Sequence, residues 1–544
     1  MRAVPAGLPG GRDRRRATPA AHGRRGAVHR VRAVPAALPG RLHRIAGPRE
    51  CPAARRTTPG TALSALPRPV GVRPDARKSA ALARPIAVLA APEFAVLALD
   101  QGSGTASVPV VAVGDPVRLG TLVARPAAPD SVSLHAPVSG RVRAIEQRPL
   151  VHGDGLCVVI ENDGAERLDT AVRPVGWNGL AGPELLERLH EAGIAGLGGA
   201  AFPAGVKLAA ARTADVSMLL LNGAECEPWI CCDDALMRER AADVVLGAQV
   251  MLAASGADSC VVAIEDDKPE AVAAMTTAID AAGDARITLR ALPAVYPLGA
   301  ERQLIDAVTG REVPHDRLPP AIGVVCQNVG TAAAVARWVR TGWPAIARIV
   351  TVTGSGVAEP ANVEARIGTT VAQLVAACGG YCGEPLSLIA GGAMTGRALG
   401  TDAAPVTKGL ACVVAATASD LSPRGPERPC IRCGDCSAAC PAYLLPQQLH
   451  RAALVDDEAG LARLGLADCI ECGCCDYVCP SGIPLVERFR AAKARKLERD
   501  IDRLRAEEAR GRHERHLRRL AAEAEAERRA FDEARRRARP ADPG

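Results

Sequence analysis

The chain has 544 residues, of which 23% are charged and only 2% aromatic, and its formal net charge is +7. A chain of this length is too long to fold around a single hydrophobic core, so several domains are expected. Fourteen arginines but only two acidic residues fall within residues 1–60, which leaves the remainder mildly acidic. The basic balance therefore gives no support to a nucleic-acid binder. No run of 18 apolar residues is uninterrupted, so no membrane-spanning helix is predicted.

Residues 1–69 form an arginine- and proline-rich segment without a single aromatic residue. Such a composition buries too little apolar surface to offset chain entropy, so we expect a disordered extension. The pattern Arg-Ala-Val-Pro-Ala occurs at residue 2 and again at residue 32. A transit peptide would share the arginine content, but the many prolines and glycines oppose an amphipathic helix. We hypothesise that the gene has been read from a start that lies too far upstream, so that this extension is absent from the native protein.

The next part of the chain is typical of a small all-β sandwich. Residues 108–117 and 132–145 are short β-branched runs separated by Gly-Asp and Ser-Gly turns. A helical pattern at residues 183–192, ended by Gly193, marks the change to a different architecture.

Strand-like runs then alternate with helical stretches, which predicts an α/β domain. The runs lie at residues 217–221, 260–264 and 322–325. A further β-rich unit begins at residues 349–353 and contains a helix near residues 370–377.

Eight of the 19 cysteines form two copies of one ladder, in which spacings of two, two and three residues end in a proline. This spacing wraps three thiolates around a [4Fe–4S] cubane, and the fourth cysteine of each ladder crosses over to the other cluster. Zinc ribbons or unligated core cysteines are the alternatives, and two proline-closed copies argue against both. The predicted ligands are Cys430, Cys433, Cys436 and Cys479 for one cluster and Cys469, Cys472, Cys475 and Cys440 for the other.

The remaining cysteines have no ladder spacing. Cys474 is expected to fill the core or lie beside a cluster without being a ninth ligand, and the other ten are expected to be small buried hydrophobes. Clustered spacing without an apolar signal-peptide core favours metal ligation in a reducing, cytoplasmic setting over disulfides.

After residue 484 the chain is almost entirely Arg, Glu and Ala, with a thin apolar stripe at Leu497, Ile501 and Leu504. This pattern predicts a long solvated helix or a weak coiled coil. A nucleic-acid patch is the alternative, but the arginines are interleaved with glutamates and no series of aromatic platforms accompanies them. A helix that docks on a partner is therefore favoured.

A glycine-rich string at residues 193–207 contains Gly196, Gly198 and Ala201, which satisfy a dinucleotide-binding pattern. The pattern should follow a strand, and here it follows a predicted helix, so a Rossmann fingerprint is not supported. A plain turn between two helices is the alternative. Such a loop can also bring backbone N–H groups close to a phosphate, and Lys207 would add positive charge.

The longer string resembles the flavin-binding glycine loop of the NADH-oxidising subunit of respiratory complex I. Residues 221–228, 296–301 and 327–331 are similar to three further loops of that site, in the same order. Each loop alone could be an ordinary turn. The resemblance implies FMN as cofactor, NAD(H) as substrate, and catalytic roles for Glu225, Glu227 and Glu301. The implied cofactor-binding residues are Gly196, Gly198, Gly199, Phe202, Lys207, Asn222, Tyr296, Gly299, Asn328 and Thr331.

With the cysteine ladders downstream of these loops, the chain resembles the RnfC family. Proteins of this family belong to the Rnf complex, the ion-translocating ferredoxin:NAD oxidoreductase of bacterial membranes. The resemblance runs from about Gly71 to the end of the ladders, although Arg73 stands where a histidine is usual. Ala201 stands where that family has glycine, which adds a methyl group beside the expected flavin. The sandwich has no lysine at its hairpin tip, so it is expected to be a docking module without attached lipoyl or biotin.

The resemblance implies a multidomain α/β and α+β protein. Its expected parts are a disordered extension (1–69), a lipoyl-like β-sandwich (70–170), a complex-I-flavin-subunit-like α/β domain (171–345), a soluble-ligand-binding β-grasp module (346–420), a ferredoxin-like helical domain for two [4Fe–4S] clusters (421–484) and a charged helix (485–544).

The implied function is electron transfer between NAD(H), through FMN, and two [4Fe–4S] clusters. The implied partners are the other subunits of an Rnf-type membrane complex and, indirectly, ferredoxin, with no nucleic acid. Membrane contact is expected only through these partners, at the cytoplasmic face of the bacterial inner membrane. A flavin-dependent cobalamin reductase of microcompartments and a non-enzymatic, cluster-bearing docking protein are the alternatives.

Overall fold

The computed structural model describes residues 70–102, 105–421 and 425–538. The predicted extension at residues 1–69 lies outside the described residues. Within the described part of the chain, no helix combines the length and the apolar character that a bilayer crossing requires.

Two antiparallel sheets form the first domain, with strand orders β2-β8-β7-β4 and β3-β5-β6. Buried residues of both sheets, among them Leu97, Val123 and Ile160, contribute to one apolar core, as the predicted β-sandwich requires. The strands are β2 (Phe94–Ala98), β3 (Val108–Pro109), β4 (Pro116–Val117), β5 (Leu122–Arg125), β6 (Leu134–His135), β7 (Gly140–Leu150) and β8 (Gly153–Asn162).

A four-stranded, wholly parallel sheet forms the second domain, in the order β11-β10-β9-β12. Its strands are short apolar runs because helices cover them. The strands are β9 (Met218–Gly223), β10 (Ser259–Glu265), β11 (Ile287–Leu292) and β12 (Val324–Asn328). The helices are α2 (Gly182–Glu191), α3 (Ala204–Thr213), α4 (Cys232–Ser255), α5 (Pro269–Ala282), α6 (Glu301–Thr309) and α7 (Val329–Thr341), with 3-10 turns η1 (Trp177–Gly179) and η2 (Pro319–Ile322).

The three predicted strands and the predicted helix of this domain are present, with one corrected boundary. The strand expected from residue 322 begins at Val324, because Ile322 ends a 3-10 turn and Gly323 adopts φ +73°. A left-handed residue there breaks the extended backbone, and glycine adopts that conformation without strain.

A six-stranded mixed sheet forms the third domain, in the order β1-β14-β13-β17-β15-β16. Its first strand comes from residues that precede the β-sandwich in the chain. The strands are β1 (Ala87–Val88), β13 (Ala347–Thr353), β14 (Ala361–Arg366), β15 (Ser387–Ala390), β16 (Arg397–Leu399) and β17 (Cys412–Ala416), and the helices are α1 (Ser79–Leu82) and α8 (Val371–Ala377). Helix α8 lies where the sequence predicts it, and Thr370 and Gln373 cap it reciprocally.

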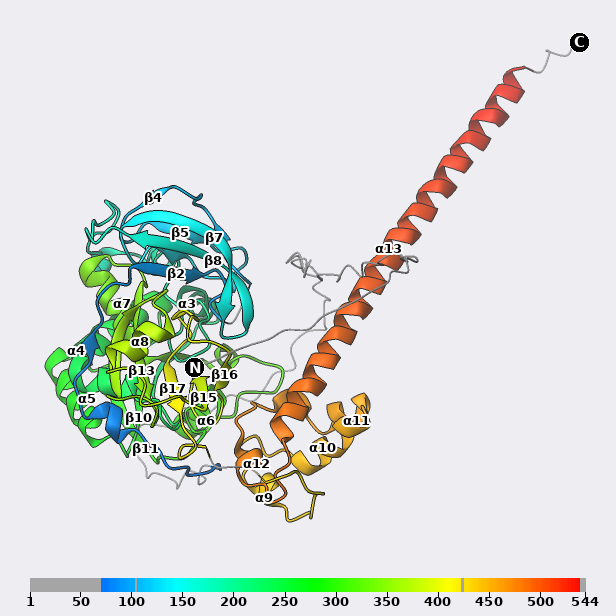
Figure 1. The fold of residues 1–544 in the computed structure, drawn as a ribbon. Helices are drawn as coiled ribbons and strands as arrows, with labels where there is room; N and C mark the ends of the chain where they lie inside the picture. The colour runs from blue at the N-terminus through cyan, green and yellow to red at the C-terminus, as the bar shows by residue number, and fades with distance from the viewer. Residues whose placement is uncertain (1–69, 103–104, 422–424, 539–544) are drawn as a thin grey trace, which may run out of the picture. The chain divides into compact units, whose positions relative to one another are not determined.

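Short helices around the cysteine ladders form the fourth domain, and a long helix follows it. The short elements are α9 (Asp435–Ala438), α10 (Pro446–Leu454), α11 (Glu458–Arg463), η3 (Leu466–Asp468) and α12 (Cys474–Tyr477). Helix α13 (Leu485–Arg537) is the predicted charged helix, drawn in orange and red in Figure 1. Only its first turns are buried, so the remainder is solvated as expected.

Candidate functional site

The order of the parallel sheet reverses between β9 and β12. From β9 the chain moves outward to β10 and β11 and then returns to the other side of β9 as β12. Ligands of open α/β sheets bind where the strand order reverses in this way. Asn222 lies at the end of β9 and Asn328 at the end of β12, so two residues predicted from sequence lie at this point.

The glycine-rich string is a loop between α2 and α3, which confirms that it does not follow a strand. It is held over the carboxyl end of β12, since the N–H of Leu197 donates to Thr331 Oγ1 at 2.9 Å. The Asn328 side chain in turn accepts from the N–H groups of Gly330 and Thr331 and caps α7. Gly199 adopts φ +106°, and no atom lies within 4 Å of where its Cβ would be. The loop therefore offers open backbone on which a flat cofactor could lie.

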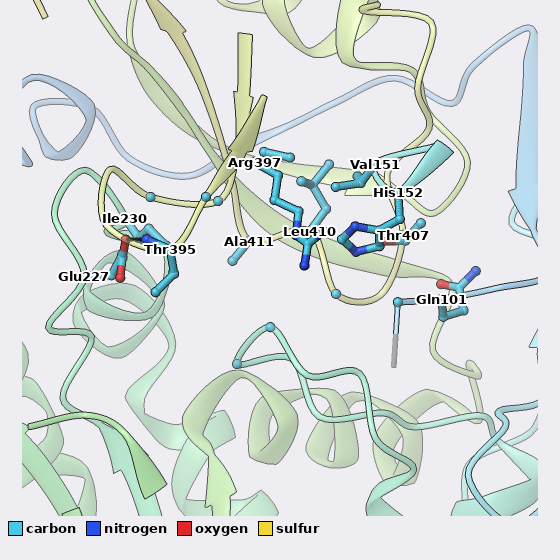
Figure 2. Close-up of a pocket in the computed structure, with 18 of the residues that line it drawn as sticks. Gln101, Val151, His152, Glu227, Ile230, Thr395, Arg397, Thr407, Leu410 and Ala411 are labelled. Carbon is cyan, nitrogen blue, oxygen red and sulfur yellow. Dashed lines mark hydrogen bonds between the residues drawn. The ribbon is translucent and has the colours of Figure 1, made fainter. Parts of the chain in front are cut away.

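A cavity of about 450 Å³ lies against this loop. It is large enough for a cofactor, and its lining comes from several domains (Figure 2). Five of the residues predicted for the flavin site line it: Gly198, Gly199, Glu227, Tyr296 and Gly299.

The other predicted residues of this site do not line the cavity. Asn222 Nδ2 donates to the carbonyl oxygen of Gly299 at 2.8 Å, which holds a lining residue in place. Lys207 and Glu301 form an ion pair of 2.6 Å. The N–H of Gly196 donates to the carbonyl oxygen of Phe202 at 2.8 Å and closes the glycine-rich loop.

Glu225 caps the start of α4. Its carboxylate accepts from the N–H groups of Asp233 and Asp234 at 2.7 and 3.0 Å. Burial raises the pKa of Glu225, while the nearby ammonium group of Lys78 opposes that shift. Burial and the neighbouring Glu225 together raise the pKa of Asp233 to about 7. Ionisation of one carboxyl group therefore disfavours ionisation of the other at the start of α4.

Glu227 lies on the cavity wall and anchors a loop of the third domain. Its Oε1 accepts from the N–H groups of Met394 and Thr395 at 2.7 and 2.9 Å. Burial raises the pKa of Glu227, and these hydrogen bonds oppose the shift. Its carboxyl group therefore has a positioning role in the structure besides any contact with a ligand.

Sequence reasoning missed the residues of the first and third domains that complete the cavity. They include Gln101, His152, Arg397, Thr407 and Leu410, all labelled in Figure 2. No motif marks them, because they reach the cavity only through the packing of three domains. The β-sandwich, expected to be a docking module, thus also contributes to the cavity wall.

A buried lysine joins three domains behind the glycine-rich loop. Lys408 is 1% exposed, and its Nζ donates to the carbonyl oxygens of Ser133 and Gly193 at 2.8 and 2.5 Å. Its own carbonyl oxygen accepts from Arg348, whose guanidinium also donates to the carbonyl oxygen of Leu197 at 3.1 Å. Burial lowers the pKa of Lys408 to about 7. Two basic side chains therefore support the loop through hydrogen bonds to its carbonyl oxygens.

The two predicted cysteine sets each line one small cavity in the cluster domain. Cys430, Cys433, Cys436 and Cys479 line the first, and Cys440, Cys469, Cys472 and Cys475 line the second. Each set takes three cysteines from one ladder and the fourth from the other, so the donor set fits two cubanes. Burial raises the pKa of Cys436, Cys440 and Cys469. These thiolates would therefore depend on the positive charge of bound iron.

The second cysteine cavity adjoins the large cavity. Cys472 and Ile470 line the large cavity as well. Tyr296 from the parallel-sheet domain donates its hydroxyl to the carbonyl oxygen of Cys472 at 2.6 Å. One cluster position therefore lies beside the glycine-rich loop.

The cysteines outside the two sets mostly follow expectation. Cys474 is buried beside Tyr296, with its Sγ 3.9 Å from that residue's carbonyl oxygen. Cys51 lies outside the described residues. Two predictions of burial are corrected: Cys382 is exposed, and Cys226 is half-buried on the cavity wall, where its Sγ accepts from the N–H of Gly299 at 3.3 Å.

Four family models match consecutive parts of the chain. The RnfC barrel sandwich hybrid domain matches residues 68–165, and the Nuo51 FMN-binding domain matches residues 189–337. The SLBB domain matches residues 349–398, and the 4Fe-4S dicluster domain matches residues 428–483. These matches define the class: an oxidoreductase protein that binds FMN and two [4Fe–4S] clusters.

Curated relatives named as the C component of the ion-translocating oxidoreductase complex match over most of the chain. The Rhodobacter capsulatus protein is 40% identical over 432 residues, which cover 79% of this chain and 83% of the relative. The Pseudomonas aeruginosa protein is 46% identical over 464 residues, which cover 85% of this chain but only 59% of the relative. The chain belongs to the RnfC family of the ion-translocating oxidoreductase complex.

Among solved structures, an NAD⁺-reducing [NiFe]-hydrogenase in the air-oxidised state matches with a TM-score of 0.40 and 23% identity. The match covers 52% of this chain and 54% of the hydrogenase chain, and a similarity at this level supports no argument about function.

Proposed function

We propose that the chain transfers electrons between NAD(H), through FMN, and two [4Fe–4S] clusters, and from there to or from the membrane subunits of its complex. Ferredoxin would exchange electrons with the chain only through those subunits. The protein would bind peripherally at the cytoplasmic face of the bacterial inner membrane. One observation carries the proposal: a single cavity is lined both by Gly198 and Gly199 of the glycine-rich loop and by the cluster cysteine Cys472.

FMN, when bound, supplies the conversion between two-electron hydride transfer and one-electron transfer. The protein would hold it with the backbone of Gly196, Gly198 and Gly199 beside Phe202. Lys207, Asn328 and Thr331 would hold its phosphate. Asn222, Tyr296 and Gly299 would shape the wall beneath the ring.

The three predicted glutamates have different proposed roles. Glu227 lines the cavity, so it would contact the bound rings and orient them. Glu225 would act from behind the wall through its charge, because its carboxylate is engaged at the start of α4. Glu301 would balance the charge of Lys207, with which it forms an ion pair.

The exposure of the cysteines supports an order for the two clusters. The set with Cys469, Cys472, Cys475 and Cys440 adjoins the cavity and would exchange electrons with FMN. In the other set, Cys430 and Cys433 are exposed. That cluster would therefore exchange electrons with the partner subunits. Electrons would therefore move through the cluster domain between the cluster beside the cavity and the cluster with the exposed cysteines.

Anaerobic titration with NADH tests the proposal on the full-length protein reconstituted with FMN, iron and sulfide. We expect NADH to bleach the flavin absorbance and to produce EPR signals of reduced clusters. A protein with eight irons whose flavin stays oxidised would contradict NADH oxidation and favour a cluster-bearing docking protein. Reduction of a corrinoid, without co-purification of membrane proteins, would favour the cobalamin reductase alternative.

A further inference from the structure

The guanidinium group of Arg397 and the imidazole of His152 lie in one corner of the large cavity. Arg397 begins β16 of the third domain, and His152 lies in the turn between β7 and β8 of the β-sandwich. Both line the cavity, and Figure 2 shows them pointing into it. The charge of Arg397 also helps to lower the pKa of His152. Among the residues that the structure describes, neither has a hydrogen-bond or ion-pair partner.

The backbone fixes the position of Arg397. It pairs with Ala390 across the β15–β16 hairpin. The turn between them is tight, because a Cβ on Gly396 would lie 2.2 Å from the carbonyl oxygen of Gly392. Glu227 accepts two N–H hydrogen bonds from the same turn. The guanidinium is therefore attached to a rigid element that also contacts the flavin side of the cavity.

The cavity lining carries charges of both signs, and its positive charge comes from Arg397. Arg397 is the only arginine or lysine among the described residues that line the cavity. The carboxyl groups of the lining are Asp100, Asp154 and Glu227. Asp100 accepts from the N–H of Gly102 at 2.8 Å, and Glu227 holds the β15–β16 turn. Partial burial and the charge of Arg397 lower the pKa of His152, which favours the neutral imidazole, and the N–H of a neutral imidazole can donate a hydrogen bond.

We infer that Arg397, assisted by His152, binds the pyrophosphate of the NAD(H) dinucleotide. A planar guanidinium donates two parallel hydrogen bonds to a phosphate, and an unpaired one in a cavity is available to do so. Lys207 and Thr331, which would hold the FMN phosphate, belong to a different domain. The corner would thus select a dinucleotide over a mononucleotide. This inference rests on the proposed function and deepens it.

Binding of ADP-ribose to the anaerobic, full-length holoprotein tests the inference without turnover. ADP-ribose has the pyrophosphate of NAD(H) but no nicotinamide. We expect Arg397→Gln to weaken its binding about tenfold or more, equivalent to about 1.4 kcal/mol, and Arg397→Lys to restore part of the loss. Isothermal titration calorimetry gives the affinity. Arg125→Gln is the matched control, because Arg125 is exposed at the end of β5 and does not line the cavity.

Steady-state kinetics with ferricyanide as acceptor give a second readout. Reduced nicotinamide mononucleotide lacks the pyrophosphate bridge and the adenosine. Arg397→Gln should therefore raise KM for NADH with little change in kcat, and should leave KM for the mononucleotide nearly unchanged.

The outcomes separate this inference from the proposed function. Unchanged ADP-ribose affinity in Arg397→Gln, with NADH still oxidised by the wild type, would overturn the inference alone. Loss of FMN from Arg397→Gln with unchanged ADP-ribose binding would also overturn it and assign the arginine to the flavin phosphate. Arg397-dependent binding of ADP-ribose by a protein that does not oxidise NADH would support the site and contradict the proposed function.

Discussion

Ala201 adopts φ +50°, a backbone conformation that favours glycine. It stands in the glycine-rich loop and is buried. An L-residue in the left-handed region costs free energy because its Cβ crowds the following carbonyl group. The loop therefore has local strain next to the proposed flavin site.

Ala201→Gly should relieve that strain. We expect the free energy of unfolding to rise by about 0.5–1 kcal/mol, after allowing for the greater chain entropy of glycine. Urea denaturation of the reconstituted protein measures it. Ala200→Gly is the control, because Ala200 has no positive φ. An equal gain in both variants would contradict the explanation.

Lys408 should make stability depend on pH. Its pKa falls from 10.5 in the unfolded chain to about 7 in the folded protein, so between these values the unfolded state binds the extra proton. Stability should therefore rise with pH across this window, by about 1.4 kcal/mol per pH unit at most.

Lys408→Met removes this group. The difference in unfolding free energy between wild type and variant should shift in favour of the wild type from pH 7 to pH 10, and should be constant below pH 6. Chemical denaturation at several pH values measures it. A difference that does not change with pH would contradict the lowered pKa.

At the scale of elements, the crossed ladders make a spectroscopic prediction. Cys440 and Cys475 stand on different ladders but line the same cavity. Cys440→Ser and Cys475→Ser should therefore impair the same cluster and give matching EPR spectra of the remaining one. Cys436→Ser, on the same ladder as Cys440, should impair the other cluster. Matching spectra for Cys440→Ser and Cys436→Ser would contradict the crossover.

Helix α13 packs its first turns into the core of the cluster domain, and ion pairs from Arg499 to Asp456 and from Arg503 to Glu458 extend the contact along the helix. Phe489 is 1% exposed in the core of that domain, whereas Phe531 on the same helix is 69% exposed. Phe489→Ala should cost about 3–5 kcal/mol and lower the iron content, because it leaves a cavity in the core. Phe531→Ala should change neither quantity. Thermal unfolding and iron analysis of both variants check this pair.

At the scale of the whole molecule, the proposed electron transfer should depend on the junction between the parallel-sheet domain and the cluster domain. Tyr296→Phe removes the hydrogen bond to the carbonyl oxygen of Cys472. FMN and iron contents should be retained, and cluster reduction after mixing with NADH should slow several-fold in anaerobic stopped-flow measurements. Tyr477→Phe, at an exposed tyrosine of α12, is the control. Equal rates in wild type and Tyr296→Phe would contradict a role for this contact.

The sequence predicted those parts of the protein whose chemistry depends on local spacing. Each cysteine ladder places three ligands of one cluster within a few residues, and the alternating strands and helices predicted an α/β domain. Asn222 and Asn328 were predicted from the resemblance of their loops, and both lie at strand ends, which meet at one edge of a parallel sheet. Glu225 and Glu227 lie two residues apart, and the sequence could not tell that one caps a helix while the other lines the cavity.

Tertiary structure alone decided what surrounds the glycine-rich loop. Gln101, His152 and Arg397 lie in two other domains and belong to no motif, so only domain packing brings them to the cavity wall. The sequence also gives no sign that Lys408 is buried, because a lysine is normally exposed. Only burial among three domains lowers its pKa. Local spacing fixes how a chain segment can hold a cofactor, whereas contacts between distant segments depend on the balance of packing over the whole molecule.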